Sequence, residues 1–182
     1  DSALNDIHGR HVRAEHVFAA IEQAAAGPVA EGAVGAGTGT ICFGWKGGIG
    51  TASRVAPAEA GGFTVGALVQ SNFGQPRELV ICGVPVGRFV QPPELAAPLD
   101  RKGSIIIVLA TNAPLTARQL HRLAARATVG LARIDSNLGH QSGDFVVAFS
   151  TVNLVEQEPE SLIVTQPAIG DEKTVMSWLF PA

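Results

Sequence analysis

The chain of 182 residues is long enough to form one domain with a substantial hydrophobic core. Its hydrophobic content of 46% and mean hydropathy of +0.24 exclude a disordered protein. A net charge of −3, with no block of basic residues, argues against nucleic acid or an anionic membrane as the main partner. The longest apolar run, residues 105–110, is far too short to span a bilayer.

The first half of the sequence predicts one helix followed by short strands and tight loops. Apolar residues recur at helical spacing over residues 13–26, and Gly27-Pro28 is a strong signal for the end of that helix. Residues 29–53 are very rich in glycine and predict loops. Strands are expected at residues 40–43, 49–53, 62–72 and 78–83.

The second half begins with a segment that resembles an exposed linker. Residues 84–103 contain four of the eleven prolines and end in "DRKG", whereas residues 104–111 predict a buried strand. Thr116 and Gln119 form a capping-box pattern that opens a helix extending to about Leu131. Its inward stripe is Leu120, Leu123, Ala124, Ala127 and Leu131, and its solvent face is Arg118, Arg122 and Arg126. A strand at 143–155 and a short helix at 171–180 complete a mixed α and β layered domain.

Two cysteines and two other patterns carry weaker signals. Cys42 and Cys82 lie in apolar, strand-like runs and are predicted to be buried free thiols. The glycines at 35, 37 and 39 suggest a phosphate cradle, but a strand rather than a helix follows them, which disfavours nucleotide binding. The histidines at 8, 11 and 16 match no standard ligand spacing and are predicted to be surface residues.

The Gly103-Ser104 pair, at the start of the buried strand, has two interpretations. It can be a turn before the strand, or it can be a bond that the protein cuts itself. Cleavage would give Ser104 a free α-amine with a pKa of roughly 7.7–8, suited to act as a general base. Gly103 offers no side chain to obstruct attack by the serine hydroxyl, and the strand would hold the nucleophile rigidly. The residues alone leave both interpretations open.

Polar residues in "NLGHQSGDFVVAFST" and "QSNFG" could serve such a nucleophile. His140, Ser142 and Asp144 alternate, so an extended strand places them on one face, with neighbours roughly 6.6 Å apart. That spacing is too wide for a direct relay within one strand, but the three could face a nucleophile such as Ser104 on an adjacent strand. Asn72, at the end of a strand, could donate to an oxyanion. On spacing alone, ordinary turns are the favoured explanation of both segments.

Taken together, several strings resemble one family in the same order over nearly the whole chain. They are "LNDIHGRHV…EHVFAAI", "GPVAEGAVGAGTGTICFGWKGGIGTASRV", "TVGALVQSNFG", "KGSIIIVLATNAPL" and "NLGHQSGDFVVAFST". The family is that of the L-aminopeptidase/D-amidase-esterases and β-peptidyl aminopeptidases. Its members are precursors that cut themselves before a serine, and "KGS" matches that site.

The resemblance implies a fold, an activity and a set of roles. The fold would be a four-layered α-β-β-α sandwich, similar to that of ornithine acetyltransferase. The enzyme would release N-terminal residues from short peptides, amides or esters through an acyl-enzyme, without a metal or cofactor. The implied residues are Gly103 and Ser104 at the cleavage site, Ser104 as nucleophile, Asn72 at the oxyanion, and Ser142 with Asp144 as the second serine and the acid.

The same resemblance implies a longer precursor. Residues 1–182 would form one domain from its C-terminal portion, with 1–103 ending the α-subunit and 104–182 forming the β-subunit. The upstream N-terminal portion of the precursor would be a partner, and the processed heterodimers would form a homotetramer. The chain has no tyrosine, although relatives place an acid and a tyrosine of the site before "LND", so part of the site is expected in a missing piece or a separate chain.

Several points remain open at this stage. Relatives that cleave β-peptides carry a glutamate where this sequence has Asp144, which leaves the contact of the acid with the serines in question. An amino-acid N-acyltransferase on the same fold is an alternative, although those relatives use threonine at the cleavage point. A non-catalytic relative is another alternative. The preferred amino-acid residue is not indicated, and for the compartment the cytoplasm is favoured over the periplasm.

Overall fold

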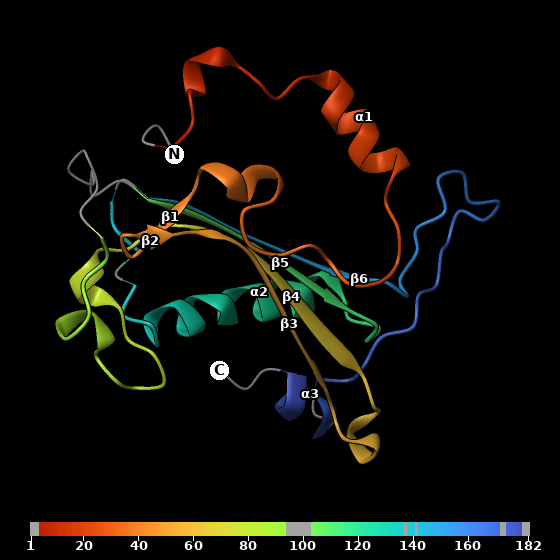
Figure 1. Ribbon diagram of the computed structural model, residues 1–182. Coiled ribbons are helices and arrows are strands. Elements are labelled where there is room, and N and C mark those ends of the chain that lie inside the picture. The colour runs from red at the N-terminus through yellow and green to blue at the C-terminus, as the bar shows by residue number, and fades with distance from the viewer. Residues whose placement is uncertain (1–3, 94–102, 137, 141, 172–173, 180–182) are drawn as a thin grey trace.

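A four-stranded sheet with the order β3-β4-β5-β6 forms the centre of the fold (Figure 1). The computed structural model describes residues 4–93, 103–136, 138–140, 142–171 and 174–179. The sheet consists of β3 (Gly48–Val55), β4 (Thr64–Asn72), β5 (Ser104–Thr111) and β6 (Gly143–Ser150). The other elements are α1 (Ala14–Glu22), α2 (Ala117–Ala132), α3 (Thr174–Leu179) and a small hairpin of β1 (Ile41–Cys42) and β2 (Trp45–Lys46). The expected mixed α and β class is confirmed.

The strand β5 lies between two neighbours along its entire length. It pairs antiparallel with β4, from Asn72 opposite Ser104 to Val65 opposite Thr111. It pairs parallel with β6, and α2 makes the crossover that a parallel connection requires. Its β-branched run "SIIIV" suits a strand that is paired on both sides.

Side chains of β5 alternate between two faces of the sheet, and α2 covers one of them. Ile105, Ile107 and Leu109 are buried there and share the hydrophobic core with Leu123 and Leu131 of α2. The core also includes Phe43, Phe73, Ala113, Leu115, Met176 and Leu179. This face therefore contains the core of the described part of the chain.

The opposite sheet face is apolar but exposed, and it is called the open face below. Ile106 on β5 and Phe145, Val147 and Phe149 on β6 are 39%, 64%, 54% and 44% exposed. The N-terminal segment with α1 passes over this side of the sheet without packing on it (Figure 1), and Val17, Phe18 and Ile21 of α1 are themselves exposed. The second large sheet of the expected sandwich is not among the described residues.

Most predicted elements are present, and the exceptions have physical reasons. The predicted strand at 78–83 is wrong: Pro76–Glu78 form a 3-10 helix, and a tight turn follows in which Ile81 and Val84 exchange backbone hydrogen bonds. Among the described residues, no strand lies beside this segment to pair with it. The strand β6 stops at Ser150 rather than at 155 because its partner β5 ends opposite, at Thr111. In the predicted linker, 86–88 form a 3-10 helix and 94–102 lie outside the described residues.

Both cysteines are free thiols, but only one is shielded from solvent. Cys42 on β1 is partly buried, and burial raises the pKa of its thiol despite hydrogen bonds with Ser71 and the backbone of Phe73. Cys82 is exposed, so its predicted burial is wrong. It lies in the turn between Ile81 and Val84 instead of a strand.

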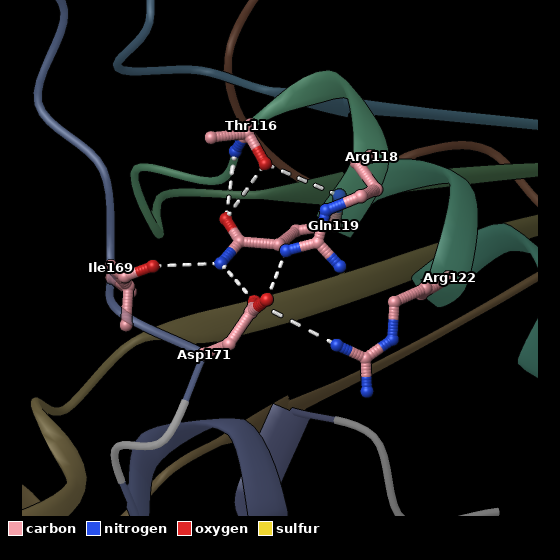
Figure 2. A network of polar contacts seen from close by, with 6 residues as sticks. All are labelled: Thr116, Arg118, Gln119, Arg122, Ile169 and Asp171. Atoms are coloured by element: carbon pink, nitrogen blue, oxygen red, sulfur yellow. Dashed lines mark hydrogen bonds and ion pairs between the residues drawn. The ribbon is translucent and has the colours of Figure 1, made fainter.

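A polar network holds the C-terminal segment against the start of α2 (Figure 2). The buried side chain of Gln119 accepts from the Thr116 N–H and hydroxyl, at 2.9 and 3.1 Å. Its amide nitrogen donates to the Ile169 carbonyl and to Asp171, each at 2.7 Å. Every polar atom of this buried amide therefore has a partner.

The predicted solvent face of α2 is confirmed, because Arg118, Arg122 and Arg126 are all exposed. Arg118 and Arg122 both form ion pairs with Asp171 (Figure 2). Hydrogen bonds from Gln119 and then Arg118 lower the pKa of Asp171 below its ordinary value of 3.8. The predicted helix at 171–180 begins only at Thr174.

Replacement Asp171→Asn is expected to lower the midpoint of thermal unfolding near neutral pH, because an amide cannot form the ion pairs. A carboxyl group whose pKa falls on folding stabilises the native state above its unfolded pKa, and this contribution disappears as pH drops through the folded-state pKa. The difference between wild type and variant should therefore shrink at pH values below 3.8. Circular dichroism against temperature measures it, with Glu156→Gln, at an exposed acid, as the control. A difference independent of pH would contradict this assignment.

The two thiols are expected to differ in reactivity towards Ellman's reagent in the native protein. Cys82 should react rapidly because it is exposed, and Cys42 slowly because burial keeps its thiol protonated. Cys82→Ser should remove the rapid phase, and Cys42→Ser should leave it intact. Equal rates for the two thiols would show that β1 does not shield Cys42.

Candidate active site

The first residue of β5 lies between two candidate partners from neighbouring strands. Ser104 is directly opposite Asn72 on β4 and directly opposite Gly143 on β6. Residues that are opposite each other in a sheet share a face, so Ser104 and Asn72 both lie on the open face. Ser104 is exposed. The sheet register thus brings the predicted nucleophile and the predicted oxyanion residue together.

The carbonyl group of Gly103 is the acceptor at the centre of this site. The Ser104 hydroxyl donates to it at 2.6 Å, and the Gly143 backbone N–H donates to it at 3.2 Å. Hydrogen bonds to a carbonyl oxygen stabilise the negative charge that develops there during nucleophilic attack. The arrangement therefore places a hydroxyl and a backbone donor at one polarised carbonyl.

Space requires glycine at position 103, whereas position 143 is less crowded. A Cβ on Gly103 would lie 2.9 Å from Phe73 Cβ and 3.0 Å from Phe73 Cα, which is closer than real Cβ atoms normally approach. A Cβ on Gly143 would lie 3.4 Å from the Ser104 hydroxyl oxygen and would occupy the space beside it. Glycine at position 103 therefore lets its backbone approach that of Phe73 closely.

The Asn72 side chain is oriented by the main chain of β1. Its Oδ1 accepts from the Ile41 N–H at 3.1 Å. Because the Ile41 N–H is a donor, the atom that it contacts must be the amide oxygen of Asn72. The amide nitrogen therefore points away from Ile41, and its two protons can be donated to a different acceptor. This geometry is compatible with the predicted role as a donor to an oxyanion.

Ser142 and Asp144 are in direct contact, which corrects the expected separation. The Ser142 hydroxyl donates to Asp144 Oδ1 at 2.6 Å. The estimate of 6.6 Å assumed an extended strand, but Ser142 precedes β6 and its side chain bends back towards the carboxylate. Asp144 is opposite Ile105, on the face that α2 covers, and the Ser104 hydroxyl bonds to the Gly103 carbonyl rather than to this pair.

A cavity of about 800 Å³ borders the site at Gly103 and Ser142, although neither Ser104 nor Asn72 is among its lining residues. His140 lies in its lining, in an exposed turn, so the structure places it beside the site and not in a relay with Ser142. The cavity offers room for a ligand larger than a single residue. Its lining consists of Phe73, Gly74, Gln75, Pro76, Arg77, Glu78, Gln91, Gly103, Ser136, Gly139, His140 and Ser142.

Sequence reasoning missed Gly143 and Ile41, which act through their backbone N–H groups. A backbone donor leaves no residue-type signature, and only the strand register reveals it. In the part of the chain that the structure describes, no three His, Cys, Asp or Glu side chains gather as metal ligands. Among the same residues, no helix has the length and apolar character needed to cross a bilayer.

Comparison with known proteins reveals extensive similarity to serine aminopeptidases. The chain is 44% identical over 191 aligned positions to the beta-peptidyl aminopeptidase BapA of Sphingosinicella microcystinivorans, covering 97% of this chain and 48% of that protein. It is 45% identical to BapA of Sphingosinicella xenopeptidilytica, covering 85% and 41%. The chain thus spans about half the length of these relatives.

Solved structures give the same result for the fold. The L-aminopeptidase D-Ala-esterase/amidase of Ochrobactrum anthropi, described as a variant of the Ntn hydrolase fold, matches with a TM-score of 0.85 and 45% identity, over 98% of this chain and 49% of that one. A Burkholderia beta-aminopeptidase matches with a TM-score of 0.82 and 44% identity, over 98% and 50%. The model of peptidase family S58 matches residues 1–182. The chain is a member of peptidase family S58.

Proposed function

We propose that the protein is a self-processing serine aminopeptidase in which Ser104 becomes an N-terminal nucleophile. The observation that carries this proposal is the Gly103 carbonyl at the head of β5, which accepts from the Ser104 hydroxyl at 2.6 Å and from the Gly143 N–H at 3.2 Å. Nucleophile, electrophile and donor are thus next to each other before any substrate binds. Membership of family S58 supports the same function.

Self-cleavage proceeds by an acyl shift. The Ser104 oxygen attacks the Gly103 carbonyl carbon, and the hydroxyl proton is transferred to the departing amide nitrogen of Ser104. The C–N bond breaks, which leaves Gly103 as an ester on the serine oxygen. Water then hydrolyses this ester and releases a Gly103 carboxylate and a Ser104 residue with a free amine. The net reaction consumes one water molecule.

The mature site repeats the chemistry on a substrate. The α-amine of Ser104 takes the hydroxyl proton as the oxygen attacks the substrate carbonyl, and the leaving amine or alcohol receives that proton. The Gly143 N–H and the Asn72 amide stabilise the oxyanion. Water hydrolyses the acyl-enzyme. The Ser142–Asp144 pair, joined at 2.6 Å, supplies a polar anchor beside the head of β5. Short peptides, amino-acid amides and esters are the proposed substrates.

The upstream portion of the same precursor is proposed to supply the second sheet. The exposed apolar side chains of Ile106, Phe145, Val147 and Phe149 support this, because an apolar face of this size requires cover in a soluble protein. The exposed apolar side of α1 supports it as well. A layer between α1 and the open face gives the order α-β-β-α, and assembly of such units into a homotetramer belongs to the same proposal.

Replacement Ser104→Ala is expected to abolish both processing and turnover in the full-length gene product, because Ser104 supplies the hydroxyl that contacts the Gly103 carbonyl and no other described residue offers one there. Denaturing mass spectrometry should show a break between residues 103 and 104 in the wild type and an unbroken chain in the variant. Hydrolysis of an aminoacyl p-nitroanilide should fall to background. Ser53→Ala, on the exposed part of β3, is the matched control. An unbroken wild-type chain that still hydrolyses the substrate would refute the proposal.

Replacement Gly103→Ala is expected to slow self-cleavage by about tenfold or more, since a shift that relieves the contact with Phe73 also moves the scissile carbonyl from its donors. The half-time of chain cleavage, followed by mass spectrometry, measures the effect. Gly130→Ala on α2 is the control, because a Cβ there meets no atom within 4 Å. Equal half-times for Gly103→Ala and wild type would show that the position of this carbonyl does not limit cleavage.

A further inference from the structure

Lys46, at the end of β2, makes a group of contacts that the proposed chemistry does not use. Its ammonium nitrogen donates to three backbone carbonyls: those of Gly37 at 2.6 Å, Gly47 at 2.8 Å and Thr40 at 3.2 Å. An ammonium group has three N–H donors, so every one of them has a carbonyl acceptor. The ammonium thus joins both ends of the segment 37–47.

This segment is rich in glycine at its two ends, while the buried Phe43 anchors its middle in the hydrophobic core. A Cβ on Gly37 would lie 2.6 Å from the Gly32 carbonyl oxygen, and one on Gly47 would lie 2.8 Å from the Ser71 carbonyl oxygen. The backbones are therefore packed directly against each other, with no room for apolar side chains between them. Thr40 is buried and donates to the Gly37 carbonyl at 3.0 Å. At the two ends of the segment, the carbonyls of Gly37, Thr40 and Gly47 are therefore held by polar contacts with Lys46, Thr40 and the Gly47 N–H.

The fixed segment leads directly to the amide that orients Asn72. Thr40 accepts from Lys46, and the next residue, Ile41, donates its N–H to Asn72 Oδ1 at 3.1 Å. The Thr40 carbonyl that contacts the lysine and the Ile41 N–H that contacts the candidate oxyanion residue therefore belong to the same peptide group. A second anchor at the same place is the Phe43 N–H, which donates to the Phe73 carbonyl at 2.8 Å.

We propose that Lys46 is a positioning residue for the oxyanion site: by binding the carbonyls of 37, 40 and 47, it holds the Ile41 N–H where it fixes the Asn72 side-chain amide. This inference rests on the proposed function, because it concerns how Asn72 is directed at the reacting carbonyl. Lys46 touches neither the substrate nor Ser104. Its loss should therefore lower kcat and the rate of self-cleavage through Asn72, while KM changes little.

A double-mutant cycle in the full-length gene product tests this dependence. The four proteins are wild type, Lys46→Met, Asn72→Ala and the double variant. Loss of an oxyanion donor is expected to lower kcat by about 10²–10³-fold in Asn72→Ala. Lys46→Met should lower kcat by about tenfold or more, with KM within about twofold of wild type. In the double variant, the lysine replacement should cost less than about twofold beyond Asn72→Ala, because Asn72 is no longer there to be positioned.

Two further proteins complete the design. Lys46→Gln keeps an amide that can donate to two of the three carbonyls, so it should recover part of the lost rate even if Lys46→Met folds poorly. Arg54→Met is the matched control, since Arg54 is a cation on exposed β3 that donates to the Ser53 carbonyl. It should retain the wild-type kcat. The rate of self-cleavage serves as the readout for any variant that does not mature.

The outcomes separate the inference from the function on which it rests. Losses that multiply in the double variant, or a Lys46→Met protein with wild-type kcat and cleavage rate, would overturn the positioning role. Wild-type rates in Asn72→Ala would instead show that Asn72 is not the oxyanion donor. A wild-type protein without cleavage and without hydrolysis would refute the proposed function itself.

Discussion

Main-chain pairing on both sides of β5 begins at its first residue, and the geometry of the site depends on it. Ser104 is opposite Asn72 on one side and opposite Gly143 on the other. A strand end normally frays, but this one is held by antiparallel and parallel ladders at once. The same pairing continues to Thr111, so the hydrophobic core under α2 and the polar site at the strand head are fixed by one register. A shift of one residue would exchange the faces of Ser104 and Ile105.

The strands β5 and β6 are apolar on both faces, so their sequence could indicate where a strand lies but not which of its faces is buried. The run "SIIIVLA" contains no polar alternation, which is typical of a strand that is covered on both sides. The run therefore predicted the bounds of β5 correctly. It could not indicate which face α2 would cover, because Ile105 and Ile106 are chemically equivalent. One of them is buried and the other is exposed, and only the crossover through α2 decides between them.

Residue types predicted the side-chain part of the candidate site better than its backbone part. Ser104, Asn72, Ser142 and Asp144 were identified by motif, and the sheet register places Ser104 opposite Asn72. The Ser142–Asp144 contact was missed because it depends on a bend before β6 that spacing cannot reveal. The donors from Gly143 and Ile41 are backbone groups, which every residue possesses. The apolar pattern at 78–83 predicted a strand, but no strand among the described residues lies beside this segment to pair with it. Pattern alone does not supply a neighbour.

The three carbonyls around Lys46 form the kind of cage that many proteins fill with a dissolved potassium or sodium ion. Here the cation is part of the chain and cannot leave by dilution, chelation or exchange with the medium. The conformation of the segment 37–47 should therefore be insensitive to the ionic composition of its surroundings, without the activation by monovalent salts that a bound ion would impose. The ammonium group belongs to the chain and is present as soon as the segment folds. The segment 37–47 therefore reaches its conformation without binding a ligand.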